Sequence, residues 1–379
     1  MRFVFWTSVC AILYTYIGYP LCLTFLRRCR YRPINKGPWY PQVSVVLAAR
    51  DEEENIKERL ENLLAQDYPA DKLEIVVVSD GSRDHTVELA HRHGGKRLKV
   101  VELEQSGGKA AALNAGVLQA SGEIVIFCDA RQRFEPGVVR ELAANFHDPQ
   151  IGAVSGELVL AQGDSSAIRE EMGVYWRYET WIRRAESATG SVIGATGAIY
   201  AIRRALFHPL PPGSILDDVI IPMHVVLQGR RTIFDDSARA HDIVSKDLSQ
   251  EWVRKVRTLA GNWQLLRLFP ELLFPWRNPC CWRFVSHKVM RLLVPAALGA
   301  MLATGALVEE PFYQAVTMLQ LFFYVLALTG AAIPASRSNR IVKLSYFFLV
   351  MNAVPVAGFW CWLSGRSGSV WRPAYKKVV

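Results

Sequence analysis

The 379-residue sequence predicts an α/β domain with a mostly parallel central sheet, placed between membrane segments at the two ends of the chain. Three observations predict this class. Between position 41 and about position 248, short β-branched runs alternate with amphipathic helical stretches, as in a parallel sheet covered by helices. Long uncharged apolar runs are concentrated near the chain ends, which explains the 51% hydrophobic content. Polar clusters follow several expected strands, where such sheets bind ligands.

The first apolar run covers residues 3–26 and contains no charged side chain. It is long enough to cross a hydrocarbon core, which needs about 20 helical residues. A basic cluster follows it at once, whereas a cleaved signal peptide has a shorter apolar core with its charge in front. We therefore expect a membrane anchor over residues 1–30, with the amino terminus outside and the basic flank in the cytoplasm.

Three further uncharged runs come late in the chain, and they predict transmembrane helices over residues 292–363 of a multi-pass plasma-membrane protein. The first of them is also short enough for a buried core helix. Their basic flanks are cytoplasmic by the positive-inside rule, so a fourth complete crossing would leave the basic tail, residues 364–379, outside. Either the last run crosses and overrides the rule, or one late run is interfacial or re-entrant.

The middle region is expected to begin with four strands, over residues 43–49, 73–79, 98–103 and 123–128, separated by helices over residues 53–66, 86–93 and 109–119. Acidic side chains follow three of these strands. Asp51 follows the first, Asp80 the second and Asp129 the fourth. Neither the glycine fingerprint of dinucleotide-binding folds nor a P-loop occurs, so the sequence excludes those two kinds of phosphate site.

Each of these acids alone has a plain structural explanation, because aspartates commonly cap helices and turns. Asp80 could cap the helix that follows it, and Asp129 could cap the segment before Pro136. Their combination with the segment Ser106–Lys109, a glycine-rich helix entry that ends in a lysine, favours a ligand site. These residues predict a site for a sugar nucleotide, with acids for the base, the ribose and a metal ion, and a cation for phosphate.

The order of the motifs resembles that of the membrane-bound family 2 glycosyltransferases, the branch that includes cellulose, chitin and hyaluronan synthases. The motifs that carry the resemblance are Ala49–Glu53, Val78–Asp84, Gly108–Gly116, Phe127–Ala130, Gly194–Ala198, Leu216–Val219 and Arg254–Arg257. The resemblance implies a GT-A-like catalytic domain over residues 41–248. It also implies an interfacial segment with an arginine motif over residues 249–291.

For the donor, the resemblance implies that Asp51 and Asp80 contact the nucleoside and that Lys109 lies beside the diphosphate. Asp129 matches the first acid of the family's Asp-x-Asp motif, which holds a divalent cation, Mg2+ or Mn2+. Arg131 stands where the second acid is expected, and it is either a surface residue or itself approaches phosphate. One carboxylate can still hold magnesium together with phosphate oxygens.

For the chemistry, the resemblance places Asp218 on the catalytic base, with Asp217 in place of the family's Glu. A carboxylate suits inverting transfer, because it accepts the proton of the acceptor hydroxyl while cations stabilise the departing diphosphate. The acid pair also has a structural explanation as the cap of a helix over residues 219–227.

Arg254 and Arg257 align with the Gln-x-x-Arg-Trp motif of the processive synthases, in which Arg257 can serve the diphosphate. Thr258 replaces the motif's Trp, and Trp263 is expected to face another direction on the same helix. Both features argue against processive polymerisation. Residues 264–276 form an amphipathic stretch that either lies on the membrane or packs under the catalytic domain.

The leading hypothesis is an integral-membrane inverting glycosyltransferase that moves a sugar from a nucleotide donor, UDP-linked, to a polysaccharide or lipid-linked acceptor at the cytoplasmic face. One alternative is a polyprenyl-phosphate glycosyltransferase, which shares the donor half. The other is a non-catalytic nucleotide-binding subunit of a polysaccharide synthesis or export complex, suggested by Arg131. Export or synthase subunits are the expected partners. Nucleic acid is not, because the basic residues behind the +9 net charge flank membrane spans.

Overall fold

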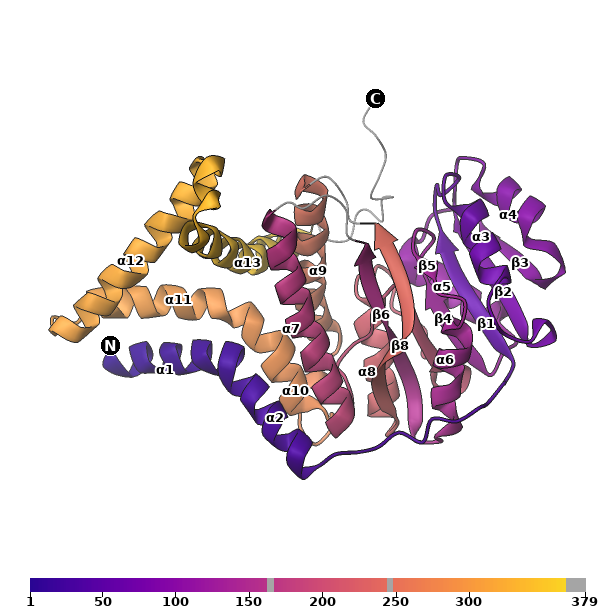
Figure 1. Cartoon of the computed structure of the whole chain (residues 1–379), viewed down its shortest axis with the longest axis horizontal. Coiled ribbons are helices and arrows are strands. Elements are labelled where there is room, and N and C mark those ends of the chain that lie inside the picture. The colour runs from indigo at the N-terminus through magenta and orange to yellow at the C-terminus, as the bar shows by residue number, and fades with distance from the viewer. Residues whose placement is uncertain (162–166, 244–247, 366–379) are drawn as a thin grey trace.

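A mixed sheet of eight strands forms the centre of the molecule (Figure 1). The computed structural model describes residues 1–161, 167–243 and 248–365 of the chain. The strands are β1 (Val43–Ala49), β2 (Leu73–Asp80), β3 (Leu98–Leu103), β4 (Ile124–Cys128), β5 (Arg133–Phe134), β6 (Ile151–Ala161), β7 (Ile199–Arg203) and β8 (Arg231–Ile243). They lie side by side in the order β3-β2-β1-β4-β7-β6-β8-β5, which confirms the predicted α/β class with a mostly parallel sheet.

The first half of the sheet is parallel and in register. Val43 lies opposite both Leu73 and Ile124, so β1, β2 and β4 begin together and end at one edge. β3 continues the parallel array beside β2. On the other side of β4, β7 runs antiparallel to both β4 and β6. The loops after β1, β2 and β4 therefore open together next to this reversal, which is where such sheets bind ligands.

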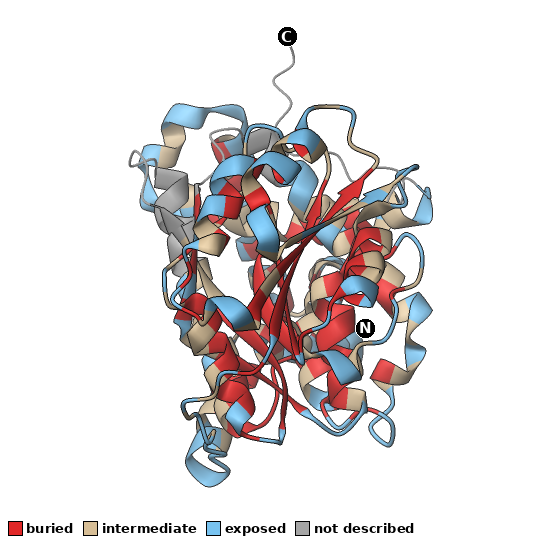
Figure 2. Cartoon of the chain, turned by 90° about the vertical axis from the view of Figure 1, so that its right-hand side faces the viewer, coloured by how far each residue is buried: buried red, intermediate tan, exposed pale blue. Residues whose placement is uncertain are grey.

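Helices cover both faces of the sheet. α3 (Ile56–Leu64), α4 (Thr86–Gly94) and α6 (Val138–Ala144) pack on one face, and α5 (Gly108–Gln119) and α8 (Asp217–Leu227) pack on the other. Every residue of β1 is buried, as expected for a strand with both faces covered. Figure 2 shows this buried layer running along the strands between exposed outer helices.

Two helices begin two or more residues away from the positions that the sequence predicts. The helix expected over residues 53–66 begins only at Ile56, because side chains from the loop after β2 hold the preceding turn. The amide of Glu52 donates to Thr86 Oγ1 at 2.8 Å, and the amide of Glu53 donates to Asp84 Oδ2 at 3.1 Å. The helix expected from residue 219 begins at Asp217, which places both candidate acids in its first turn.

In the part of the chain that the structure describes, four helices are long and apolar enough to cross a membrane, namely Arg2–Cys29, Cys281–Ala306, Pro311–Ala332 and Arg340–Leu363. The first contains α1 (Arg2–Leu13), a π-helical turn (Tyr14–Gly18) and α2 (Tyr19–Cys29); the second contains α10 (Cys281–Phe284), a π-helical turn (Val285–Val289) and α11 (Met290–Ala306). The third is α12 and the fourth α13. Arg2 forms an ion pair with Glu310, so α1 and α12 begin at the same end of this helix group.

Two further long helices, α7 (Ala167–Thr189) and α9 (Leu248–Leu268), lie between the apolar helices and the sheet (Figure 1). They run across the direction of α1 and α11. α2 packs on α7, and α13 packs on α9. This middle layer therefore connects the sheet domain to the apolar helices.

Candidate active site

A lysine bridges two carboxylates at the carboxyl edge of the sheet. Asp129 follows β4, Lys109 is the second residue of α5, and Asp217 is the first residue of α8. Lys109 Nζ lies 3.0 Å from Asp129 Oδ1 and 3.4 Å from Asp217 Oδ1. Burial disfavours the charged lysine, but attraction to the two acids outweighs burial and holds the pKa of Lys109 above its ordinary value. Three residues that the sequence predicted for donor, metal and catalysis therefore meet at one point.

The acid pair at the start of α8 has two different environments. Asp217 accepts the hydroxyl proton of Tyr200 at 3.0 Å, in addition to its pair with Lys109. Asp218 lies against Gly197, where a Cβ atom would stand 3.3 Å from its Oδ2. Burial raises the pKa of Asp218 and the charge of Asp217 raises it further, to about 6. Asp218 is therefore suited to accept a proton near neutral pH.

Cations around Asp218 limit this rise in its pKa. Lys288, Lys109 and Arg183 each favour the ionised form of Asp218. Arg183 comes from α7 and donates to Thr196 Oγ1 at 2.8 Å, next to Gly197. Lys288 comes from the second apolar helix. Two elements of the membrane side thus act electrostatically on the candidate base.

Asp80 is fully buried and braces the glycine-rich loop that enters α5. Its carboxylate accepts hydrogen bonds from Ser106 Oγ at 2.6 Å, Gly107 N at 2.7 Å and Gly108 N at 3.1 Å. The alternative in which Asp80 caps the next helix is wrong, because His85 is the N-cap residue of α4 and the Thr86 amide donates to Asp84 Oδ1 at 3.0 Å. Asp80 thereby fixes the first turn of α5, which carries Lys109.

Asp51 joins the loops that follow β1 and β2. Its Oδ1 accepts the amide of Arg83 at 2.8 Å, and its own amide donates to Ser82 Oγ at 3.2 Å. Asp51 has φ +52°, a left-handed conformation that is uncommon for a residue other than glycine. Such strained positions concentrate at functional sites.

Arg131 is held by a partner on β8 and is not a surface residue. It forms a salt bridge with the buried Asp242, which also accepts a hydrogen bond from Gln132 Nε2 at 3.1 Å. Within residues 1–161, 167–243 and 248–365, no group of three His, Cys, Asp or Glu side chains is placed to hold a metal ion. Asp129 alone is thus the acid available at this strand end, and it fits a cation bound mainly by phosphate oxygens.

Arg257 on α9 faces the acid cluster from the membrane side. Burial lowers its pKa, and the charges of Asp217 and Asp129 act in the opposite direction. Arg254 lies one turn earlier and is exposed. The hydroxyl of Thr258 is turned back onto the helix, where it donates to the Arg254 carbonyl at 3.0 Å. The charge of Arg257 thus interacts with two acids of the cluster.

The comparisons with known proteins agree with this geometry. The model of the family described as Glycosyl transferase family 2 matches residues 44–210, which contain the three strand-end acids and Lys109. Residues 44–210 therefore have the sequence of a family 2 glycosyltransferase domain. Poly-beta-1,6-N-acetyl-D-glucosamine synthase of Staphylococcus aureus (strain COL) is 27% identical over 275 residues, 70% of this chain and 66% of that protein. The namesake protein of Staphylococcus epidermidis is 25% identical over 229 residues, 59% of this chain and 55% of that protein.

The match therefore spans less than two thirds of each of these relatives, 66% of the first and 55% of the second. Among solved structures, the mannosyltransferase of Pyrobaculum calidifontis in complex with GDP-Man and Mn2+ aligns with a TM-score of 0.70 and 24% identity. The alignment covers 96% of this chain and 99% of that one, so the GT-A fold and the helices around it are shared.

Two aromatic features of this chain lie away from the acids. Trp263 on α9 packs against Phe359 and Trp362 of α13, at ring-centroid distances of 5.0 and 6.3 Å, so it faces the apolar helices. Of the amphipathic stretch over residues 264–276, Leu265 and Leu272 are buried in the core of the catalytic domain, and Trp276 is 76% exposed. The stretch thus packs under the domain through these leucines, and its end projects furthest.

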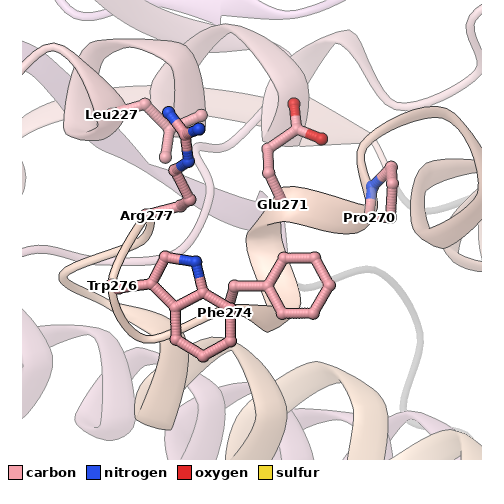
Figure 3. Close-up of a pocket in the computed structure, with 6 residues that line it drawn as sticks. All are labelled: Leu227, Pro270, Glu271, Phe274, Trp276 and Arg277. Carbon is pink, nitrogen blue, oxygen red and sulfur yellow. The ribbon is translucent and has the colours of Figure 1, made fainter.

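A pocket of about 760 Å3 opens at that projecting end (Figure 3). It is lined by Leu227, Pro270, Glu271, Phe274, Trp276 and Arg277. The rings of Phe274 and Trp276 stack at 5.0 Å. Asp217 is the first residue of α8 and Leu227 is the last, so this pocket lies one helix length away from the acid cluster.

Sequence reasoning missed three residues of the site, namely Tyr200, Arg183 and Lys288. Tyr200 is the second residue of β7, the strand that begins directly after the glycine motif Gly194–Ala198, and this closeness to the motif was the available signal. Arg183 and Lys288 act on Asp218 from helices far away in the sequence, and nothing in their local pattern indicates this contact. The partner of Arg131 is likewise 111 positions away.

Proposed function

We propose that this chain is an integral-membrane inverting glycosyltransferase that transfers a sugar from a nucleotide donor at the cytoplasmic face. UDP-N-acetylglucosamine is the first donor to test, because the two staphylococcal relatives are named for a polymer of N-acetylglucosamine. The observation that carries the proposal is the Asp129–Lys109–Asp217 bridge, which places the acid pair of α8 beside the strand-end acid expected at the diphosphate.

Donor binding is divided between the two sides of this bridge. Lys109 and Arg257 supply positive charge to the diphosphate, and Asp51 lies at the strand end where the nucleoside binds. Asp80 acts on the nucleoside side through the Ser106–Gly108 loop that it holds. Asp129 would hold a divalent cation, which when bound neutralises charge on the departing diphosphate.

Transfer requires a base that is ionised at the working pH. Its ionised form must be stabilised only weakly, so that the base readily takes up a proton. Asp218 accepts the proton of the acceptor hydroxyl as that oxygen forms a bond to the anomeric carbon. The bond from the anomeric carbon to the diphosphate oxygen breaks on the opposite face, and the nucleoside diphosphate leaves with the electron pair. Attack opposite the leaving group inverts the anomeric configuration. Asp217 stays paired with Lys109 and Tyr200, so it orients α8 and accepts no proton.

The acceptor is a polysaccharide end or a lipid-linked sugar. Neither residue that could replace the synthases' Trp is available, since Thr258 bonds back to its own helix and Trp263 packs on α13. This supports one or a few additions per encounter. The basic cluster after the first apolar helix supports a cytoplasmic catalytic domain, because such clusters stay on the cytoplasmic side.

A donor screen on protein reconstituted in lipid nanodiscs tests the proposal. Released nucleoside diphosphate and product length are read together for UDP-, GDP- and dTDP-sugars. We expect release with one donor class, dependent on Mg2+ or Mn2+, and short products. Binding of UDP without release from any donor, even with membrane-extracted acceptors, would instead identify a non-catalytic subunit. A polyprenyl-phosphate sugar as the product would identify the first alternative.

A further inference from the structure

The two ends of the apolar helix group can be told apart by their contacts. At one end, Arg2 pairs with Glu310, and the ring of Phe5 packs on Tyr313 at 4.8 Å. At the other end, the amide of Arg32 donates to the Ala188 carbonyl at the end of α7, at 2.8 Å. The first helix therefore leads from an outer end, marked by Glu310, to an inner end on the catalytic domain.

α12 begins at the outer end and returns to the inner one. It starts at Pro311, beside Glu310, and its 22 residues have a length of roughly 33 Å, enough for one crossing. α13 (Arg340–Leu363) begins where α12 finishes, because a Cβ atom on Gly330 would lie 3.0 Å from Cβ of Tyr346. α13 thus starts at the inner end.

The far end of α13 is also at the inner end. A Cβ atom on Gly358 would lie 2.8 Å from Leu259 Cβ and 3.0 Å from the Ala260 amide, both on α9. On its other side α9 contacts the catalytic domain, where Gln264 accepts the Ile215 amide at 3.0 Å. A complete crossing would instead have brought Leu363 to the level of Glu310.

The middle of α13 lies at the level of α7. Tyr16 donates its hydroxyl to Asn352 Oδ1 at 3.4 Å, and its carbonyl accepts the hydroxyl of Tyr178, a residue of α7, at 3.1 Å. Figure 1 shows α13 between α12 and α9, on the side of the sheet domain. The start of α13 therefore contacts the end of α12, its middle contacts a residue of the first apolar helix that also contacts α7, and its end contacts α9.

We propose that α13 lies along the cytoplasmic surface of the membrane, so that the chain crosses three times and leaves α13 on the same side as the catalytic domain. The free face of α13 contacts lipid at the boundary between headgroups and acyl chains. This lipid is continuous with the lipid around the three spans. The exposed side chains that would enter this boundary are apolar, namely Ile341, Leu344, Val356, Trp360 and Leu363.

This placement removes the conflict in the charge pattern. The basic residues after α13 lie outside the described residues, but the chain enters them from the inner end. The positive-inside rule is then obeyed along the whole chain. The assignment of this side to the cytoplasm rests on the proposed function. The location of α13 and the catalytic domain on one shared side does not depend on it.

The test uses three full-length chains, each with one protease-cleavable epitope. One epitope follows Val379, one lies between Glu309 and Glu310, and one lies in the exposed Gly95–Lys96 turn of the catalytic domain. Sealed right-side-out and inside-out vesicles are treated with protease and blotted. We expect the Val379 and Gly95 epitopes to be cut in the same vesicles and the Glu309 epitope in the opposite ones.

Cleavage of the Val379 and Glu309 epitopes in the same vesicles would overturn the proposal, since α13 would then cross. Cleavage of the Gly95 epitope only from outside would contradict the proposed cytoplasmic face and leave the placement of α13 intact. Each tagged chain must elute as a single species in detergent, which shows that the insertion has not unfolded it.

Discussion

Lys109 Nζ lies 3.0 Å from Oδ1 of Asp129 and so neutralises the acid that would otherwise be free for a divalent cation. The same ammonium group holds Asp217 at 3.4 Å. Donor binding must therefore rearrange this bridge, because the diphosphate brings its own negative charge to the lysine. Under the proposed function, metal, lysine and diphosphate would be coupled through this one side chain.

This coupling predicts opposite effects of Lys109→Met on two ligands. Affinity for UDP should fall by about 10- to 100-fold, because a charge-assisted contact is lost. Affinity for Mn2+ without nucleotide should rise, because Asp129, Asp217 and Asp218 lose their shared counter-charge. Calorimetry with each ligand measures both effects. Lys99→Met, an exposed lysine of β3 paired with Glu74, is the matched control and should change neither.

The pKa of Asp218 predicts the acid limb of the rate profile. kcat/KM should fall tenfold per pH unit below about 6, because protonated Asp218 cannot accept the acceptor proton. Lys288 favours the ionised form, so Lys288→Gln should move this limb to higher pH while Lys288→Arg leaves it in place. Rates from pH 5 to 8 at saturating metal measure the limb. If the acid limb of Lys288→Gln stays at the same pH, Lys288 does not influence the ionisation of Asp218.

The salt bridge between Arg131 and Asp242 predicts a strong loss of stability when one partner is removed. Arg131→Leu leaves the buried Asp242 without its cation and should lower the free energy of unfolding by about 3 kcal/mol. The double variant Arg131→Leu, Asp242→Leu should recover most of that loss, because no buried charge remains. Thermal unfolding of the unmodified protein, the two single variants Arg131→Leu and Asp242→Leu, and the double variant in one detergent gives the double-mutant cycle. Equal losses in the single and double variants would contradict a buried pair.

Close packing predicts that α9 cannot accept a larger residue at Gly261. A Cβ atom there would lie 2.7 Å from Leu216 Cγ, directly before the acid pair. Gly261→Ala should therefore lower turnover more than it lowers membrane expression, since it shifts the segment that carries Asp217 and Asp218. Gly299→Ala in α11 is the matched control, because nothing lies within 4 Å of its Cβ position.

The strand ends could be predicted from sequence because local patterns determine them. β-branched runs show where β1, β2 and β4 lie, and parallel register then brings Asp51, Asp80 and Asp129 to one edge. The same pattern does not show which way a side chain turns. Asp80 was expected at the nucleoside, and its carboxylate is occupied by the loop into α5. Its role on the donor stays a prediction.

Long-range charge pairing could not be predicted in the same way. Arg131 was read as a departure from a metal motif, but its meaning depends on Asp242 at the end of β8. Lys288 and Arg183 come from helices whose apolar or amphipathic pattern says nothing of Asp218. These contacts depend on how α7 and the second apolar helix pack against the sheet domain, which one sequence does not specify.

The most direct test of the central claim is single-turnover sugar transfer by Asp218→Asn in nanodiscs. Turnover should fall by about 10²- to 10⁴-fold, the usual contribution of a general base, with UDP affinity retained. The pKa of Asp218 lies above its ordinary 3.8, so its ionisation above pH 6 opposes folding, and the variant should unfold at the same or a higher temperature. Turnover within a few-fold of the unmodified protein would contradict Asp218 as the base and the mechanism built on it.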